Sequence, residues 1–334
     1  MSVDLATRYL GLQLKNPLVV SACPLTGNLA TLSKLEESGA AAVVLPSLFE
    51  EIIEHEVAEV ARLYDYQETE ADQPPGFHPQ LKRYNAGSEH YLLHLREAKK
   101  AIRIPVIASL NGTTPGGWTR YAKRIEDAGA DALELNVYFV PTDPRVSAAE
   151  VEQRYIDLVR SVRETVSIPL TVKIGPYFSN VSYVARELVE AGADGLVLFN
   201  RYLHPDIDID RMAVEPRVEF STRDELWLSL RWVAIIHDQL QTSLAANSGI
   251  HFTEDVIKAL LAGADVAMMA SVLLERGPQH LATLLDELEH WMTSSRFESI
   301  DQFRGSLDRG HLPDASALER ANYTRALASF TEEL

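Results

Sequence analysis

The chain has very little cysteine: Cys23 is the only one among 334 residues. A single thiol cannot form a disulfide within the chain, and it cannot supply the ligands of a thiolate zinc site or an iron–sulfur cluster. Positive charge is also scarce, because 31 basic residues stand against 48 acidic ones and the formal net charge is −17. An acidic surface of this kind argues against nucleic acid or an anionic membrane as a partner.

Long apolar runs are missing as well. No apolar stretch approaches about 18 residues without charges, which excludes a transmembrane helix, and the first residues lack the basic and then apolar pattern of a signal peptide. We therefore expect a cytoplasmic protein. Hydrophobic residues make up 46 % of the chain, which is usual for a globular core.

The chain does contain a repeated phrase, in which a helical pattern ends at a glycine and a short apolar run follows. The glycines are Gly39, Gly129, Gly192 and Gly263, and the runs are AVVLPS, ALELNV, GLVLFN and VAMMAS. Glycine ends helices because it adopts positive φ without a Cβ clash. An apolar run without polar alternation is typical of a strand buried on both faces. The repeats therefore predict parallel βα units.

Eight strands are predicted in this way, at 17–22, 42–47, 105–110, 132–137, 169–174, 195–200, 244–248 and 266–270, with helices such as 118–128, 148–166, 181–191 and 253–262 between them. Alternating strands and helices in this number favour a single TIM (β/α)8 barrel over residues 1–334, and an open doubly wound sheet is the alternative. Residues 5–16, with a turn at Gly11, predict an N-terminal hairpin that plugs the barrel.

Two long catalytic-face loops and a tail complete the predicted architecture. Residues 48–87 and 201–222 follow strand ends, where loops carry function, and both are candidate lids. From about Phe297 we expect a C-terminal helical extension of two terminal helices.

The predicted carboxyl ends of the strands, where barrel enzymes place their functional side chains, carry amides and small residues. Clustered carboxylates or histidines are missing there, so no metal site is expected. Lys173 ends an otherwise apolar strand, and burying its ammonium costs several kcal/mol unless a partner compensates. It could reach solvent, pair with an anionic ligand, or act as a Schiff-base amine.

A small-residue turn, Asn247 to Ile250, precedes the predicted helix 253–262. Its exposed N–H groups, together with Ala270 and Ser271 after the eighth strand, predict the phosphate cradle that barrels form at strands seven and eight.

Several short motifs together resemble the dihydroorotate dehydrogenase barrels and the related barrel domain of dihydropyrimidine dehydrogenase. The resemblance spans roughly residues 5–290 and rests on the order and spacing of these motifs: Leu10-Gly11-Leu12 with Lys15-Asn16-Pro17, Leu133-Glu134-Leu135-Asn136, Val172-Lys173, Phe199-Asn200, and Ser248-Gly249-Ile250 with Ala262-Gly263-Ala264-Asp265.

The resemblance implies an FMN-dependent oxidoreductase of CH–CH bonds, close to pyrimidine metabolism, and a homodimer. Lys173 would lie beside the flavin N1/O2 edge and stabilise negative charge on the reduced ring. The residues implied to hold FMN are Ser21, Ala22, Ser47, Asn111, Asn136, Lys173, Asn200, Ser248, Gly249, Ala270 and Ser271, and those implied to hold the substrate are Asn85, Asn136, Asn200 and Arg201. Arg201 could bind a substrate carboxylate, or form a salt bridge within the lid.

The chain also departs from the family at the loop that carries the catalytic base. Phe139 stands where the family has the Cys or Ser base, and Pro141 stands where it has a substrate-binding Asn. Phenylalanine cannot accept a proton, so we expect a substrate other than dihydroorotate or a different base. Tyr138 is the candidate catalytic residue beside Lys173, although a phenol with a pKa near 10 is a poor base at pH 7. Asp143 and His204 on the lid loops are further candidates.

Two rival hypotheses remain at this stage: a flavin-free barrel lyase that uses Lys173 as a Schiff base, and a flavin-binding redox subunit without independent turnover. Because iron–sulfur ligands are missing, electrons would pass to a soluble acceptor or through a separate redox partner protein.

Overall fold

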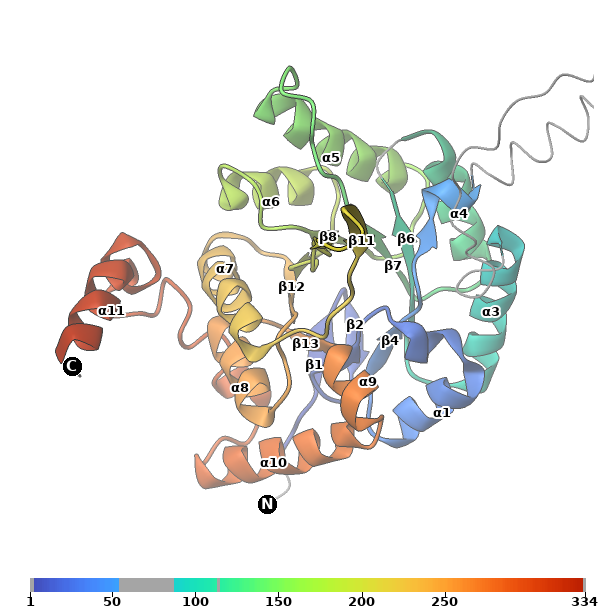
Figure 1. Cartoon of the computed structure of the whole chain (residues 1–334). Coiled ribbons are helices and arrows are strands. Elements are labelled where there is room, and N and C mark those ends of the chain that lie inside the picture. Colours follow the sequence, from blue (N-terminus) through green and yellow to red (C-terminus); the bar gives the residue numbers. More distant parts are fainter. Residues whose placement is uncertain (1–2, 54–86, 113–114, 333–334) are drawn as a thin grey trace, which may run out of the picture.

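The computed structural model describes residues 3–53, 87–112 and 115–332. Eight parallel strands form a closed barrel inside a ring of helices (Figure 1). The strands are β3 (Leu18–Val20), β4 (Ala42–Val44), β6 (Val106–Asn111), β7 (Ala132–Asn136), β8 (Leu170–Ile174), β9 (Gly195–Leu198), β12 (Ser243–Asn247) and β13 (Val266–Met269). Pairing of β4 with β6 closes the ring. Closure confirms the TIM barrel and excludes the open sheet.

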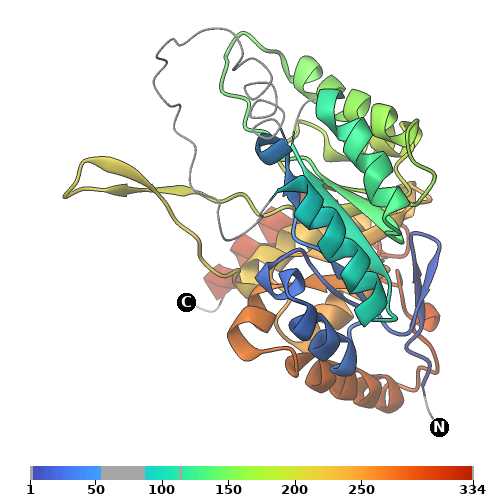
Figure 2. The same ribbon diagram turned by 90° about the vertical axis from the view of Figure 1, so that its right-hand side faces the viewer.

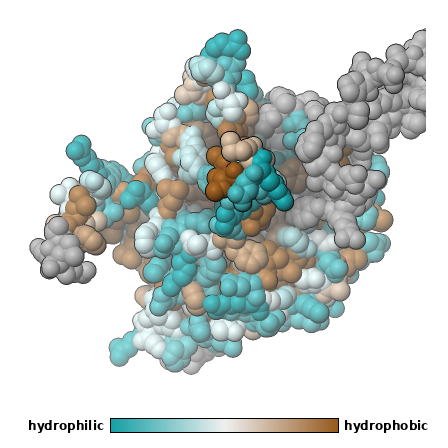
Figure 3. All heavy atoms as spheres, viewed as in Figure 1, coloured by the Kyte–Doolittle hydropathy of each residue, from teal (hydrophilic) through white to brown (hydrophobic). Residues whose placement is uncertain are grey.

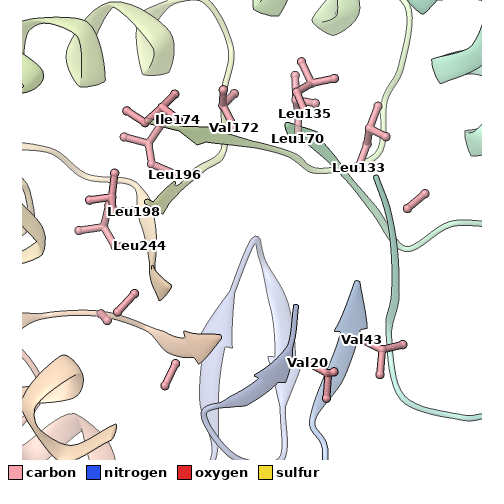
Figure 4. Close-up of a cluster of buried hydrophobic side chains, with 14 of the residues drawn as sticks. Val20, Val43, Leu133, Leu135, Leu170, Val172, Ile174, Leu196, Leu198 and Leu244 are labelled. Atoms are coloured by element: carbon pink, nitrogen blue, oxygen red, sulfur yellow. The ribbon is translucent and has the colours of Figure 1, made fainter. Parts of the chain in front are cut away.

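The outer face of the barrel packs against the surrounding helices. These are α1 (Leu29–Glu37), α3 (Ser88–Ala101), α4 (Pro115–Asp127), α5 (Ala148–Arg163), α6 (Val181–Glu190), α7 (Leu226–Gln239), α8 (Thr253–Ala262), α9 (Ser271–Arg276) and α10 (His280–Ser294). Figure 4 shows Leu135, Val172 and Leu196 on the strands of this buried cluster, and each is fully buried. Burial on both faces explains why the strand sequences lack polar alternation.

The barrel interior is closed from below by the predicted hairpin, which comprises β1 (Thr7–Tyr9) and β2 (Leu12–Leu14). Its turn places Leu10 and Gly11 at φ 53° and 75°. Tyr9 and Leu14 join the buried cluster inside the barrel, and the Tyr9 hydroxyl lies 3.2 Å from Thr171 Oγ1. The hairpin therefore fills the lower end of the barrel interior with side chains that the short strands do not provide.

The aspartates of the repeated phrase have a common structural role. Asp131, Asp194 and Asp265 each accept a hydrogen bond from the backbone N–H of a residue at the start of the preceding barrel strand. The donors are Val106 at 2.7 Å, Leu170 at 2.8 Å and Leu244 at 2.7 Å. Each carboxylate therefore satisfies an N–H group at the lower rim of the sheet.

The segment after β9 forms a projecting hairpin, in which β10 (Pro205–Asp208) pairs with β11 (Ala213–Pro216) in antiparallel register. Figure 2 shows it extending from the carboxyl-end face of the barrel, opposite the side where β1 and β2 lie. The other predicted lid begins with β5 (Leu48–Phe49), which pairs with β6. Residues 54–86 of that lid lie outside the described residues.

The tail differs from the prediction of two terminal helices. After Phe297 the described chain has two 3₁₀ turns, η3 (Ile300–Gln302) and η4 (Ala315–Leu318), and one α-helix, α11 (Arg320–Glu332). Gly305, at φ 73°, and Pro313 interrupt helical structure between them. Among the described helices, none has the length and apolar character needed to cross a bilayer.

Candidate active site

A pocket of about 250 Å³ opens at the carboxyl ends of the strands and brings together most of the predicted site residues. Those that line it are Ser21, Ala22, Ser47, Asn136, Lys173, Asn200, Arg201, Ser248, Gly249, Ala270 and Ser271. They come from seven of the eight barrel strands or the turns that follow them. Ligands of barrel enzymes bind at this face, so we treat this cavity as the candidate active site.

Lys173 carries the only positive charge on the barrel strands that line this cavity. It lies on β8, in register with Asn136 on β7, and its side chain is buried at 7 % exposure. Among the described residues, no hydrogen bond or ion pair reaches its Nζ atom. A buried ammonium without a partner is costly, and a negatively charged or electron-rich ligand in the cavity would offset that cost.

Amide groups frame the pocket beside Lys173. Asn200 Nδ2 donates to Asn136 Oδ1 at 2.7 Å. Asn247 accepts a hydrogen bond from Ser21 Oγ at 2.7 Å and donates to the Phe199 carbonyl at 2.7 Å. Asn247 is therefore a strut that fixes the ends of three strands, whereas Asn136 and Asn200 keep donors and acceptors for a planar ligand.

A buried polar chain continues from the pocket into the barrel. The Ser47 and Ser109 hydroxyls lie 2.8 Å apart, and Ser109 Oγ donates to Glu134 Oε1 at 3.3 Å. Glu134 is 1 % exposed and faces the barrel interior one layer below Asn136. No ion pair joins it to Lys173 in the described structure.

The turn after β12 has the geometry of an anion cradle. Ser248 and Gly249 both have positive φ, at 74° and 72°, so successive N–H groups are turned toward one side. A Cβ at Gly249 would lie 2.5 Å from the Leu226 nitrogen, and only glycine fits there. Ser271 Oγ accepts a hydrogen bond from Ser221 N at 3.0 Å. The phosphate site at this turn stays a prediction.

The Arg201 guanidinium forms hydrogen bonds and an ion pair within the protein. Its Nε donates to Glu225 Oε2 at 2.8 Å, and its terminal nitrogens donate to the backbone carbonyls of Glu219 and Phe220. The guanidinium thus holds the carboxyl-terminal end of the segment that contains β10 and β11 in place. Its predicted contact with a substrate carboxylate stays a prediction.

Two predicted residues of the described chain, Asn111 and Tyr138, are not among those that line the cavity. Asn111 ends β6, half-buried, in register with Asn136. Tyr138 packs its ring 4.4 Å from that of Tyr202 instead, and Asn85 lies outside the described residues. Phe139, at the position of the missing base, stacks its ring under the Arg154 guanidinium at 5.2 Å, which is a contact with α5.

Four lining residues were not predicted, namely Phe49, Ser221, Met268 and Met269, whereas Asn247 and Ile250 belong to the turn predicted for the phosphate. Met268 and Met269 belong to an apolar strand and give no chemical signal. Ser221 reaches the pocket only because the long segment after β9 folds back, where its hydroxyl lies 3.2 Å from His251 Nε2. No local pattern in the sequence could have placed it.

Comparison with known proteins shows that the chain is similar to dihydroorotate dehydrogenases. The family model described as dihydroorotate dehydrogenase matches residues 81–292. The chain is 26 % identical to the catalytic subunit of dihydroorotate dehydrogenase B (NAD(+)) from Thermoplasma volcanium, over 90 % of this chain and 98 % of that protein. The proteins of the same name from Endomicrobium trichonymphae and Listeria innocua are 24 % and 27 % identical, over 92 % and 91 % of this chain and 99 % and 98 % of theirs.

Fold, site and relatives define the class of this protein: a flavin-dependent oxidoreductase that acts on CH–CH bonds. Within that class, the chain belongs to the dihydroorotate dehydrogenase family.

Proposed function

We propose that the chain binds FMN at the mouth of the barrel and uses it to oxidise or reduce a carbon–carbon bond of a small substrate other than dihydroorotate. The observation that carries the proposal is the buried, unpartnered Lys173 ammonium. Bound FMN would supply hydride and electron transfer, which no side chain can perform.

The pocket residues fit this cofactor in chemistry and order. Lys173 would hold its positive charge against the electron-rich edge of the ring and raise the flavin's midpoint potential. Asn136 and Asn200 would orient the polar edge of a planar ligand, because their mutual hydrogen bond holds both amides in place. The N–H groups at Ser248, Gly249 and Ser271 would bind the phosphate.

The substrate site departs from that expected of a dihydroorotate dehydrogenase. Phe139 cannot take a proton, and its ring packs on Arg154 of α5. A site built to hydrogen-bond its substrate loses orders of magnitude in rate when those groups are missing. Very weak or absent turnover of dihydroorotate is therefore expected.

A separate protein is proposed as the route by which electrons leave or arrive. The relatives named above are catalytic subunits of NAD(+)-dependent enzymes, and Cys23 alone cannot build an iron–sulfur centre in this chain. We also propose a homodimer in the cytoplasm.

Absorption spectroscopy tests the proposal directly. The purified chain, mixed with FMN and passed through a desalting column, should stay yellow with one FMN per chain and show the two visible flavin bands. Anaerobic addition of dihydroorotate should then bleach the flavin far more slowly than a working substrate does. A colourless protein that takes up no FMN would contradict the cofactor assignment, and rapid bleaching by dihydroorotate would contradict the substrate assignment.

A further inference from the structure

A second cavity, of about 390 Å³, lies outside the candidate active site, where the loops after β7, β8 and β9 meet. We call it the aromatic pocket, and its main walls are Tyr138, Tyr155, Tyr177, Phe178 and Tyr202. Its volume falls in the range of small-molecule sites. In Figure 1 these loops run between the barrel ends and the helices α5 and α6.

Tyr202 is the centre of the pocket wall. Its ring lies 4.4 Å from that of Tyr138 and 5.0 Å from that of Tyr177, both in tilted contact. Its hydroxyl donates to the Phe139 carbonyl at 3.3 Å. Tyr155, whose side chain is hydrogen-bonded to that of Tyr202, meets Phe178 edge to face at 5.1 Å. The rings are held by one another, and such aromatic surfaces favour stacking with a further ring.

Gly175 is what allows Tyr202 to occupy this place. A Cβ at Gly175 would lie 2.8 to 2.9 Å from three atoms of the Tyr202 phenol. No positive φ requires glycine at this position, so the close approach of the ring is the reason that a side chain does not fit. The absence of a side chain at Gly175 is therefore required for the position of the Tyr202 ring.

The pocket has no carboxylate, ammonium or guanidinium in its wall. Among the described residues that line it, none is Asp, Glu, Lys or Arg, and His204 is the single histidine. Burial raises the pKa of Tyr155 and of Tyr202, so both phenols stay neutral and protonated in physiological conditions. A cationic ligand would lose its hydration without finding a carboxylate, and an anionic ligand would find no ammonium such as Lys173 provides in the candidate active site.

The aromatic pocket also adjoins the active site through the chain. Tyr138, Gly175 and Tyr202 each lie two residues beyond an active-site residue, namely Asn136, Lys173 and Asn200. The aromatic pocket is therefore lined by the loops that continue from three strand ends of the candidate active site, and the two cavities share no lining residue.

We propose that the aromatic pocket binds an uncharged, planar aromatic ring, and that this ring is part of the substrate. Tyr202 is the specificity-determining residue. The word substrate rests on the proposed function, whereas ring binding as such does not need the flavin.

Calorimetric titration with 2-naphthol, a neutral bicyclic ring, tests the inference on the full FMN-loaded chain. One equivalent should bind. Tyr202→Ala should weaken binding by about tenfold or more, because it removes a buried ring surface, and Tyr202→Phe should retain it. Gly175→Ala should weaken binding as Tyr202→Ala does, since it displaces the same ring. Tyr183→Ala, at an exposed tyrosine on α6, should leave the affinity unchanged.

Flavin content, measured by absorbance in every variant, separates the two proposals. Normal FMN uptake without 2-naphthol binding overturns this inference and leaves the proposed function intact, whereas ring binding without FMN uptake does the reverse. Unchanged affinity in Tyr202→Ala overturns the assignment of that residue. Tighter binding of benzoate or tetramethylammonium than of 2-naphthol overturns the assignment of an uncharged ligand.

Discussion

At the scale of single residues, the molecule places one lysine at the carboxyl-end rim of the barrel with little of the residue exposed. Lys173 is 7 % exposed, at the end of a strand whose other side chains are buried. Natural proteins rarely leave a charge in this state without a partner or a ligand. The proposed flavin site therefore rests on this residue.

Replacing Lys173 tests this role. Lys173→Met keeps the approximate length of the side chain and removes the charge, so FMN binding should weaken about tenfold or more, and the flavin midpoint potential should fall because negative charge on the reduced ring is no longer offset. Fluorescence titration measures the first effect and redox-dye equilibration the second. Lys173→Arg should restore most of the potential, and an unchanged potential in Lys173→Met would show that the ammonium does not face the flavin.

A second residue-scale prediction concerns Glu126, at the end of α4. Burial opposes its ionisation, but hydrogen bonds from Lys123, Ser167 and Ile168 outweigh that effect and lower its pKa to about 2. A folded-state pKa below the ordinary 4.5 means that the carboxylate stabilises the fold above pH 4.5, and that this stability is lost as the pH falls toward 2.

Glu126→Gln should therefore destabilise the protein by about 1.5–3 kcal/mol at pH 7, and the difference from wild type should shrink on acidification. Urea unfolding at several pH values measures it. Glu164→Gln, at an exposed position in the turn after α5, is the matched control and should change little. A deficit that stays constant down to pH 2 would contradict the assignment.

At the scale of elements, the repeated phrase combines a helix stop with a strand anchor. In three of the four copies the glycine ends the helix, and the aspartate two residues later accepts a hydrogen bond from an N–H group at the start of the preceding strand. Helix and sheet are thus joined at the lower rim by one local pattern, which explains why it recurs along the chain.

Asp194→Ala should expose this function of the phrase. It leaves the Leu170 N–H without its acceptor and removes an ion pair with Arg163, so a loss of about 1–2 kcal/mol is expected. Chemical denaturation gives the value, and amide exchange at the start of β8 should quicken. Asp210→Ala, at the exposed tip of the projecting hairpin, should cost less than about 0.5 kcal/mol. Equal losses in the two variants would refute the anchoring role.

At the scale of the whole molecule, the barrel carries a hairpin with one apolar and one charged face. Ile207 and Val214 are opposite one another across β10 and β11, at 69 % and 70 % exposure, while Asp206 forms an ion pair with Arg217 on the other face. Figure 3 shows apolar and polar residues side by side where the hairpin stands in front of the barrel. The apolar face therefore adds little to the stability of this chain.

The double variant Ile207→Ser with Val214→Ser should accordingly keep the thermal midpoint within about 2 °C of wild type. Val197→Ser, in the buried interior of the barrel, should lower it by several degrees because it places a hydroxyl among apolar side chains. Differential scanning calorimetry compares the two. A drop in the hairpin variant as large as that of Val197→Ser would mean that its apolar face is covered in solution.

The barrel and most of the residues that line its pocket follow from the order of the amino acids alone. Apolar runs after helix-ending glycines encode strands that are buried on both faces. In a parallel barrel the carboxyl ends of all strands lie at one rim, so residues such as Lys173 and Asn136 come together there independently of the loop conformations. The motifs therefore predicted the candidate site without any knowledge of the loops.

The positions of the loop residues, in contrast, depend on tertiary contacts. Ser221 enters the pocket, Arg201 pairs with Glu225, and Tyr138 packs on Tyr202, because long segments choose their path by packing and ion pairing with distant parts of the chain. Those contacts are non-local, and no periodicity or spacing in the sequence encodes them. The aromatic pocket likewise forms through non-local contacts between loops.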